Sequence, residues 1–224
     1  MTFAANANVN QPQLMKNFFL IDDHAIVRSG IKFWLSAEYH PCEIDEAENG
    51  KEAYQKVQEK DYDLVMLDIQ MPETNSFDLL KSILNDKPDS KVLIFSMNSE
   101  SMYAKRFLKA GAMGFVSKDA PIEELKKAVD LILNNRKYFS DKFIESSFSE
   151  KVGEENNNPF STLSDREFEI TNLLMEGKAV GEISALLNIK SSTTGTYKAR
   201  IFEKLNIQNV FQLIELGTLY DIKK

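Results

Sequence analysis

The sequence predicts a doubly wound α/β domain with a five-stranded parallel sheet, followed by a small all-α domain of four helices. Between Asn17 and Asn134, short apolar runs alternate five times with longer segments of helical period, a pattern typical of βαβ units. Beyond residue 160 the chain shows four helix patterns and no strand pattern. A chain of 224 residues is long enough for two domains of ordinary size.

The elements of the α/β domain follow from these runs in order. Strands are predicted at residues 17–21, 43–47, 64–67, 92–95 and 114–116, and helices at 25–37, 51–58, 76–85, 101–110 and 122–134. The runs DLVMLD and KVLIFS are apolar throughout because central strands of a parallel sheet are buried on both faces. Pro121 suits the first turn of the last helix.

The second domain is predicted from residues that start and stop helices. Ser164 and Glu167 form the capping box of a first helix, which runs to about Glu176 and is ended by Gly177. Three further helices are predicted at about 180–187, 193–205 and 210–220.

A change in composition sets the domain boundaries. The segment 139–160 is polar and acidic without a sustained period, so we predict a linker with a short helix around 143–148. The polar, Asn-rich residues 1–16 are predicted to be a loose tail. These boundaries leave residues 17–138 for the α/β domain and residues 161–224 for the helical domain.

Composition also excludes some classes of protein. A hydrophobic fraction of 43% is ordinary for globular chains, and no apolar stretch approaches a membrane span, so a cytoplasmic protein without membrane contact is expected. The single cysteine, Cys42, cannot form an internal disulfide and is interpreted as an unreactive thiol.

Acidic and polar residues gather where the predicted strands end. Asp22 and Asp23 follow the first strand, Asp68 the third, Ser96 the fourth and Lys118 the fifth. Ligands of such sheets bind in the crevice outside the carboxyl ends of the strands. Three carboxylates repel one another there unless a cation lies between them, and Mg²⁺ prefers oxygen ligands. An acid pair after a strand can also be a helix N-cap, but the matching residues at the other strands favour a metal site.

Four stretches carry a resemblance to a known family. IDDHAIVRSGI, VMLDIQMPE, LIFSMNSE and GAMGFVSKD resemble, one by one, the motifs of the flavodoxin-like receiver domain of two-component response regulators. The resemblance implies that Asp68 accepts a phosphoryl group from a histidine kinase. It also implies a Mg²⁺ ion held by Asp23, Asp68 and the backbone carbonyl of Gln70, with Asp22 assisting through water.

The same resemblance implies roles for three further residues. Lys118 would pair with a phosphoryl oxygen, Ser96 would supply the hydroxyl that moves to the phosphate, and Phe115 would be the aromatic side chain that turns inward behind it. This set is chemically sufficient because phosphoryl transfer needs positioning and charge neutralisation more than covalent chemistry. Ser76 replaces a glycine often found in the family's loop, and His24 is not expected to bind Mg²⁺, which disfavours imidazole.

The short helix, turn and longer helix near the C-terminus indicate a helix-turn-helix, whose second helix lies in the major groove of DNA. The segment 163–219 resembles the LuxR-type DNA-binding domain of NarL/FixJ-type response regulators, through LSDRE, Gly177, Glu182 with Ile183, and KARIFEKLNI. The resemblance implies a transcription factor that binds duplex DNA.

The predicted recognition helix carries few side chains that read bases. Its outward face would hold Ser192, Gly195, Thr196, Ala199 and Glu203, and the first four cannot form the bidentate bonds that specify bases. Family members often have lysine where Gly195 stands. We expect this glycine in the first turn after a Ser192 cap, where it costs the helix little.

Our hypothesis for the DNA contacts separates phosphates from bases. Contacts to phosphates are assigned to Lys190, Thr193, Tyr197, Lys198 and Arg200, and contacts to thymine methyl groups to Thr196 and Ala199. Such contacts favour A·T-rich sites, with DNA shape supplying further specificity. Residues 160–224 carry eight basic and eight acidic side chains, so a single copy should bind DNA weakly.

The expected function is that of a transcription factor switched by phosphorylation, not of a turnover enzyme. Phosphorylation of Asp68 would favour a homodimer whose two C-terminal domains bind paired half-sites. One alternative is a regulator that acts through protein contacts with weak or no DNA binding. Another is a metal-dependent phosphohydrolase that uses the acidic cluster, and turnover of external phosphate esters would indicate it.

Overall fold

A computed structural model describes residues 15–72, 74–149, 158–220 and 222 of the chain. Its N-terminal part contains five parallel strands in the order β2-β1-β3-β4-β5. The strands are β1 (Lys16–Ile21), β2 (Cys42–Ala47), β3 (Leu64–Leu67), β4 (Val92–Ser96) and β5 (Gly114–Ser117). The order reverses beside β1, so the ends of β1 and β3 border the crevice in which a doubly wound sheet binds its ligand.

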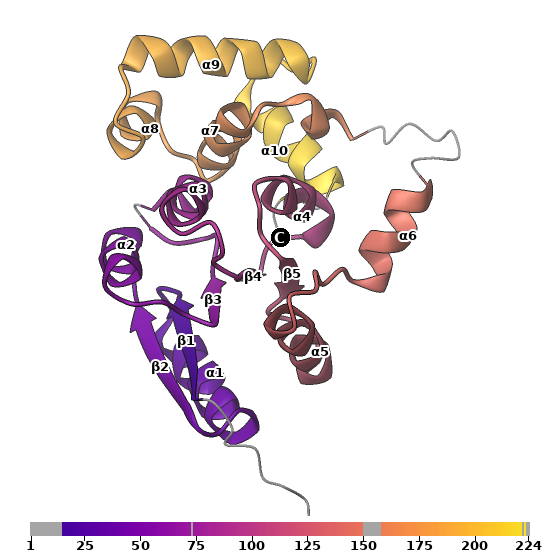
Figure 1. Ribbon diagram of the computed structural model, residues 1–224. Helices are drawn as coiled ribbons and strands as arrows, with labels where there is room; N and C mark the ends of the chain where they lie inside the picture. The colour runs from indigo at the N-terminus through magenta and orange to yellow at the C-terminus, as the bar shows by residue number, and fades with distance from the viewer. Residues whose placement is uncertain (1–14, 73, 150–157, 221, 223–224) are drawn as a thin grey trace, which may run out of the picture.

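Five helices cover the two faces of this sheet (Figure 1). They are α1 (Ala25–Glu38), α2 (Gly50–Glu59), α3 (Ser76–Asp86), α4 (Glu100–Lys109) and α5 (Ile122–Leu133). Side chains alternate along a strand, so Phe19 and Ile21 face the core under α2, α3 and α4, whereas Phe18 and Leu20 face α1 and α5. The predicted fold class is confirmed, and each of these elements begins and ends within a residue of its predicted bounds.

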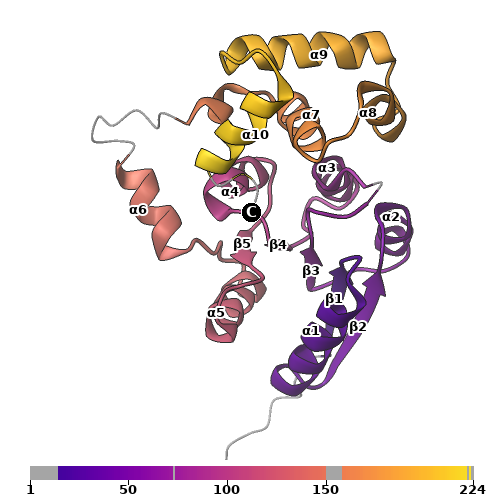
Figure 2. The same ribbon diagram turned by 180° about the vertical axis from the view of Figure 1, so that it is seen from behind.

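The C-terminal part is entirely helical in its described residues (Figure 2). It contains α6 (Asp141–Ser149), a 3₁₀ turn η2 (Pro159–Thr162), α7 (Asp165–Met175), α8 (Val180–Leu186), α9 (Ser191–Lys204) and α10 (Val210–Leu219). The helix predicted at 143–148 is present as α6, whereas η2 was not predicted. Residues 1–14 of the predicted tail and 150–157 of the predicted linker lie outside the described residues.

Local signals in the sequence explain how α7 begins and ends. The hydroxyl of Ser164 accepts a hydrogen bond from the Glu167 backbone N–H, and the Glu167 carboxylate accepts one from the Ser164 backbone N–H, as the predicted capping box requires. Gly177 has a φ of +82°, a left-handed conformation that glycine adopts without strain. The apolar face of α7 then packs on α9 and α10 through fully buried residues such as Ile170 and Leu174.

None of the helices in the described part of the chain combines the length and apolar character that a bilayer span requires.

Candidate functional site

The acidic residues predicted to form a metal site meet at the carboxyl edge of the sheet. Asp22 and Asp23 follow β1, and Asp68 follows β3, which pairs with β1 in parallel. Carboxylate oxygens of these three residues and a ring nitrogen of His24 lie within 4.8 Å of one another. Asp22 and Asp68 are 5% and 3% exposed, so their charges are largely removed from water. Such a cluster requires compensation by cations.

Lys118 supplies part of that compensation. Its Nζ lies 2.6 Å from Asp22 Oδ2 and 2.6 Å from Asp68 Oδ2. The side chain is only 6% exposed. The loop after β5 brings Lys118 to this position, where its backbone N–H donates to the Ser96 carbonyl at 2.9 Å. One buried ammonium group therefore bridges two buried carboxylates from different strands.

The remaining acceptor atoms fit a small divalent cation. Among the described residues, Asp23 Oδ1 is buried without a hydrogen-bond partner. His24 Nδ1 lies 2.9 Å from this oxygen, but not in hydrogen-bond geometry. The Gln70 backbone N–H donates to Asp68 Oδ1 at 3.1 Å, which holds the Gln70 backbone beside the cluster. An orphaned carboxylate oxygen in an oxygen-rich pocket is the donor chemistry that Mg²⁺ requires.

The two predicted switch residues lie inside the domain. Ser96 ends β4 and is fully buried, and its Oγ accepts a hydrogen bond from the Asn98 backbone N–H at 3.4 Å. Phe115 lies on the neighbouring strand, opposite Ile94, and is 1% exposed. Its ring belongs to the core that also contains Phe107 of α4. Phe115 is therefore buried in the unphosphorylated chain, and its predicted movement on phosphorylation stays a prediction.

Two residues that were not predicted as part of the site hold the loops that carry Asp22 and Asp68. Arg28 of α1 is 6% exposed, and its Nη1 donates to the Asp22 carbonyl at 2.6 Å. Ser76 begins α3, and its Oγ donates to the Asp68 carbonyl at 3.1 Å. Arg28 shares the inward period of α1 with Leu35, a signal that could have identified it. The glycine that is often found at the position of Ser76 in the receiver family would lack this hydroxyl.

Buried hydroxyl groups fix the geometry of the helix-turn-helix. Thr194 of α9 is fully buried, and its hydroxyl lies 2.8 Å from that of Ser184 on α8. Ile201, about two turns further along α9, is also fully buried. Thr194 and Ile201 therefore belong to the inward face of this helix, and α9 packs against both α7 and α8.

Most of the residues predicted to contact DNA lie on the exposed side of α9, whereas Tyr197 packs against the core of the domain. Their accessibility divides them into an exposed set, Lys190, Thr193, Thr196, Ala199 and Arg200, and a partly buried set, Tyr197 and Lys198. The predicted Ser192 cap is wrong, because Lys190 is the N-cap residue and α9 begins at Ser191. Gly195 is consequently the fifth residue of α9, beyond the first turn, where glycine carries its full cost to the helix.

A substitution at Gly195 should strengthen both the helix and its DNA binding. A Cβ atom at this position would meet no atom within 4 Å, so side chains fit without strain. We expect Gly195→Ala to stabilise the domain by up to about 1 kcal/mol in thermal unfolding. Gly195→Lys should in addition tighten DNA binding and steepen its salt dependence by about one phosphate contact. Equal DNA affinity for the alanine and lysine variants would contradict a position of residue 195 at the DNA interface.

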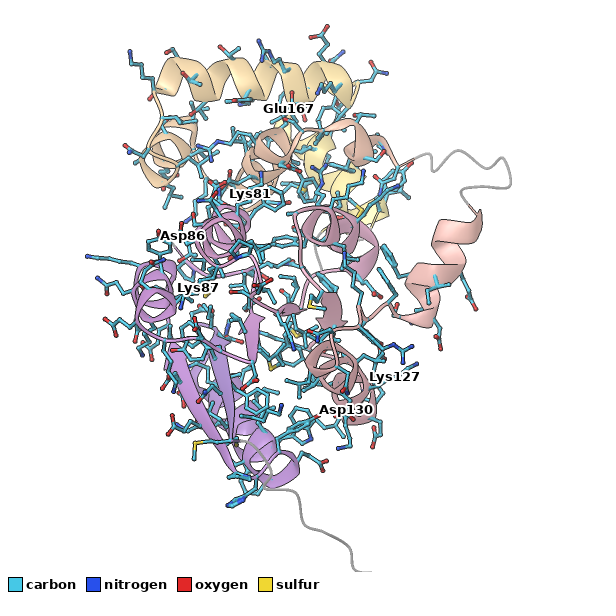
Figure 3. The ribbon with its side chains drawn as sticks, viewed as in Figure 1. Lys81, Asp86, Lys87, Lys127, Asp130 and Glu167 are labelled. Atoms are coloured by element: carbon cyan, nitrogen blue, oxygen red, sulfur yellow. The ribbon has the colours of Figure 1, made fainter. Side chains whose placement is uncertain are left out.

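Glu167 anchors α7 to α9 through a buried charge (Figure 3). Its Oε2 accepts hydrogen bonds from the Ser164 backbone at 2.7 Å and from Lys204 Nζ at 2.6 Å. Burial raises the pKa of Glu167, but the bonds from Lys204 and Ser164 outweigh burial and hold this pKa below its usual value. A lowered pKa means that the carboxylate stabilises the fold above its unfolded-state pKa and loses this effect as the pH falls.

We therefore expect Glu167→Gln to lower stability by about 1–2 kcal/mol at neutral pH, because a charged acceptor is replaced by a neutral one. The difference from the parent protein should shrink as the pH falls below about 4. Thermal unfolding monitored from pH 7 downwards measures both effects. Glu203→Gln, on the exposed side of α9, is the matched control and should change little at any pH. A pH-independent difference would contradict the ionic origin of the effect.

Comparison with known proteins agrees with this geometry. The family described as "Response regulator receiver domain" matches residues 18–130, and "Bacterial regulatory proteins, luxR family" matches residues 161–216. Response regulator GacA of Pseudomonas viridiflava is 32% identical over 207 residues, which are 91% of this chain and 95% of GacA. Oxygen regulatory protein NreC of Staphylococcus carnosus is 34% identical over 212 residues, 92% of this chain and 96% of NreC.

A solved structure shares the fold of both domains. RcsB from Salmonella enterica serovar Typhimurium, bound to promoter rprA in the presence of the phosphomimetic BeF3-, superposes with a TM-score of 0.73. The superposition covers 92% of this chain and 99% of RcsB at 22% sequence identity.

A flavodoxin-like sheet with an acidic pocket at its carboxyl edge, joined to a LuxR-type helix-turn-helix, defines the class of DNA-binding response regulators. Within this class, the chain belongs to the two-component response regulators of the NarL/FixJ type.

Proposed function

We propose that Asp68 accepts a phosphoryl group from a histidine kinase and that this phosphorylation controls DNA binding by the C-terminal domain. The observation that carries the proposal is the bridge of Lys118 between Asp22 and Asp68, beside the orphaned oxygen of Asp23. This arrangement places a nucleophilic carboxylate next to one fixed cation and one candidate metal position. Phosphoryl transfer requires both positioning and charge neutralisation.

Each residue of the pocket has a role in this proposal. Asp23, Asp68 and the carbonyl of Gln70 would hold Mg²⁺, with Asp22 assisting through water, and the bound ion would supply positive charge for the phosphoryl oxygens. Lys118 pairs with a phosphoryl oxygen once Asp68 is modified. Ser96 turns its hydroxyl to another of these oxygens, and Phe115 fills the space behind it.

Arg28 and Ser76 position the two loops that carry the carboxylates. Both residues donate to backbone carbonyls, Arg28 to that of Asp22 and Ser76 to that of Asp68. They hold the reacting groups without touching the phosphoryl group. The chain takes part in one transfer to itself, and we assign it no turnover of external substrates.

The output of the switch is binding to duplex DNA. Lys190, Lys198 and Arg200, with Thr193 and Tyr197, hold phosphates, while Thr196 and Ala199 contact thymine methyl groups in A·T-rich half-sites. Phosphorylation favours a homodimer, whose two copies of α9 bind paired half-sites. RcsB, which shares the fold, was solved bound to a promoter.

Because the proposed target of this chain is chromosomal DNA, we place the protein in the cytoplasm. The domain boundaries that we propose are 17–138 and 161–224, with a linker between them.

The test measures DNA binding by the full-length protein with and without Mg²⁺ and a small phosphodonor. Duplexes of random and A·T-rich sequence are compared at several salt concentrations, with Asp68→Ala as the matched variant. We expect binding to tighten only with the phosphodonor, and to show no such response in Asp68→Ala. The salt dependence of binding counts the phosphate contacts.

Other outcomes separate the competing functions. A phosphorylated Asp68 without DNA binding under any condition would indicate a regulator that acts through protein contacts. A G·C-rich consensus selected from random DNA would contradict the assigned base contacts.

A further inference from the structure

The receiver domain and the helix-turn-helix domain touch through α4 and α7. Figures 1 and 2 show α7 lying between α9 and the receiver helices α3 and α4, so that α9 is on the side of the domain that faces away from the sheet. The Tyr103 ring of α4 meets the Phe168 ring of α7 at a centroid distance of 5.1 Å and an angle of 70°. These two aromatic residues are 8% and 4% exposed, so they form a genuinely buried contact.

Arg106 of α4 is the polar centre of this contact. Its Nη1 donates to Asp165 Oδ1 at 2.9 Å, and its Nη2 donates to the carbonyls of Phe160 at 3.0 Å and Leu163 at 2.7 Å. The guanidinium group also lies 4.3 Å from the centre of the Phe168 ring. One side chain of the receiver therefore satisfies three acceptors in the segment that ends the linker and begins α7. Hydrogen bonds from a charged donor are stronger than neutral ones, and without Arg106 the two carbonyls would lose this partner.

The same interface is continuous with the interior that surrounds the phosphoacceptor site. Phe115, Phe107 and Tyr103 belong to one hydrophobic core with Phe168. Because this core is closely packed, a movement of Phe115 would also displace residues of α4. The helix α4 in turn contacts the DNA-binding domain directly. Packed contacts of this kind can transmit a conformational change from one domain to the other while the two domains stay in contact.

The docked arrangement leaves the DNA-binding surface open. In the described residues, α9 packs on α7 and α8 of its own domain. Lys190, Thr196 and Arg200 are exposed while α7 is docked on α4. Occlusion by the receiver therefore does not explain how DNA binding would be controlled in this arrangement.

We propose that the α4–α7 interface persists when the protein binds DNA, and that Arg106 couples the state of the receiver to the orientation of the helix-turn-helix domain. The protein then meets DNA as one two-domain body. The coupling rests on the proposed function, since the transmitted state is phosphorylation of Asp68. The persistence of the interface does not rest on the proposed function, because it is proposed for the unphosphorylated chain as well.

The first experiment tests persistence without any phosphodonor. Spin labels are attached to cysteines that replace Lys81 on α3 and Lys178 beyond α7, two exposed positions that take no part in the Arg106 contact, in a Cys42→Ala background. The distance between the labels is measured in the free and the DNA-bound protein. We expect one narrow distribution that is the same in both. A distribution that broadens or shifts to longer distances on DNA would overturn the proposal.

The second experiment tests Arg106 from both sides of the interface. Arg106→Glu on α4 and Asp165→Lys on α7 each place like charges together, and both variants should broaden the distance distribution. Both should keep Asp68 phosphorylation and unphosphorylated DNA affinity within about twofold of the parent, yet lose most of the increase in affinity on phosphorylation. Lys109→Glu, an equal change of charge at an exposed position of α4, is the control and should behave like the parent.

The outcomes separate this proposal from the proposed function. If the parent protein is not phosphorylated on Asp68, the proposed function fails while the distance measurements still decide persistence. If Arg106→Glu retains the narrow distribution, or retains the full response to phosphorylation, Arg106 does not couple the domains.

Discussion

Replacement of Lys118 by methionine is expected to destabilise the receiver domain by about 3 kcal/mol at neutral pH without Mg²⁺, because removing one partner of a buried ion pair leaves uncompensated charge. The side chain of Lys118 lies between Asp22 and Asp68, 2.6 Å from an oxygen of each. Both carboxylates are buried, so water cannot screen their repulsion once the ammonium group is gone.

Mg²⁺ should restore part of the lost stability of Lys118→Met, because an ion that binds only the folded state stabilises it by mass action. Transfer of a phosphoryl group to Asp68 should still fall by about a hundredfold, since a fixed cation next to the transferred group is missing. Chemical denaturation with and without Mg²⁺ measures the first effect, and incorporation of phosphate measures the second.

The control for this variant is Lys127→Met on α5, whose side chain is exposed (Figure 3). It should leave stability within about 0.5 kcal/mol of the parent and leave phosphorylation unchanged. A Lys118→Met protein as stable as Lys127→Met in the absence of Mg²⁺ would contradict the role of Lys118 as the main counter-charge of the pocket.

Replacement of Phe115 by alanine is the second substitution with a large expected effect. The ring is 1% exposed, and truncating a buried phenylalanine costs about 3–5 kcal/mol through lost burial and the cavity that remains. Because Phe115 lies on the strand next to Ser96 and shares its core with Phe107 of α4, Phe115→Ala should also lose the increase in DNA affinity on phosphorylation. Phosphorylation itself should persist, since Phe115 holds no reacting atom.

Stability and signalling are separated by a control on the other face of the sheet. Leu93 is fully buried in the core under α1 and α5, and Leu93→Ala should cost about 2–5 kcal/mol. It should nevertheless keep the response of DNA binding to phosphorylation. If Phe115→Ala is too unstable to measure, Phe115→Leu removes the ring while filling most of the space. An intact response in both Phe115 variants would exclude this side chain from the switch.

The sequence by itself determined the fold class, the order of the elements and the residues of the acidic pocket. Buried strands such as DLVMLD are apolar on both faces, and the carboxyl ends of parallel strands meet at one edge of the sheet. Asp22, Asp68, Ser96 and Lys118 could be placed together for this reason. Helix caps are equally local, so the capping box of Ser164 and Glu167 was predicted correctly.

Helix starts without a strong side-chain cap were harder to predict. Lys190 caps α9 without a side-chain hydrogen bond, so the usual cap preferences pointed to Ser192 and placed Gly195 in the first turn. The support of the pocket by Arg28 was missed for a different reason. An arginine in an amphipathic helix is usually exposed, and its burial depends on acceptors such as the Asp22 carbonyl, which only the folded loop provides.

Only the tertiary structure decided how the two domains meet. Arg106 is one of several basic residues along α4, and its partners lie more than 50 positions away in the chain. No period or cap distinguishes it from Lys109, which is exposed. The difference arises because only the position of Arg106 on α4 lies against these partners. They are the carbonyls of Phe160 and Leu163 and the ring of Phe168. Long-range contacts of this kind depend on the shape of both surfaces, which local sequence patterns do not record.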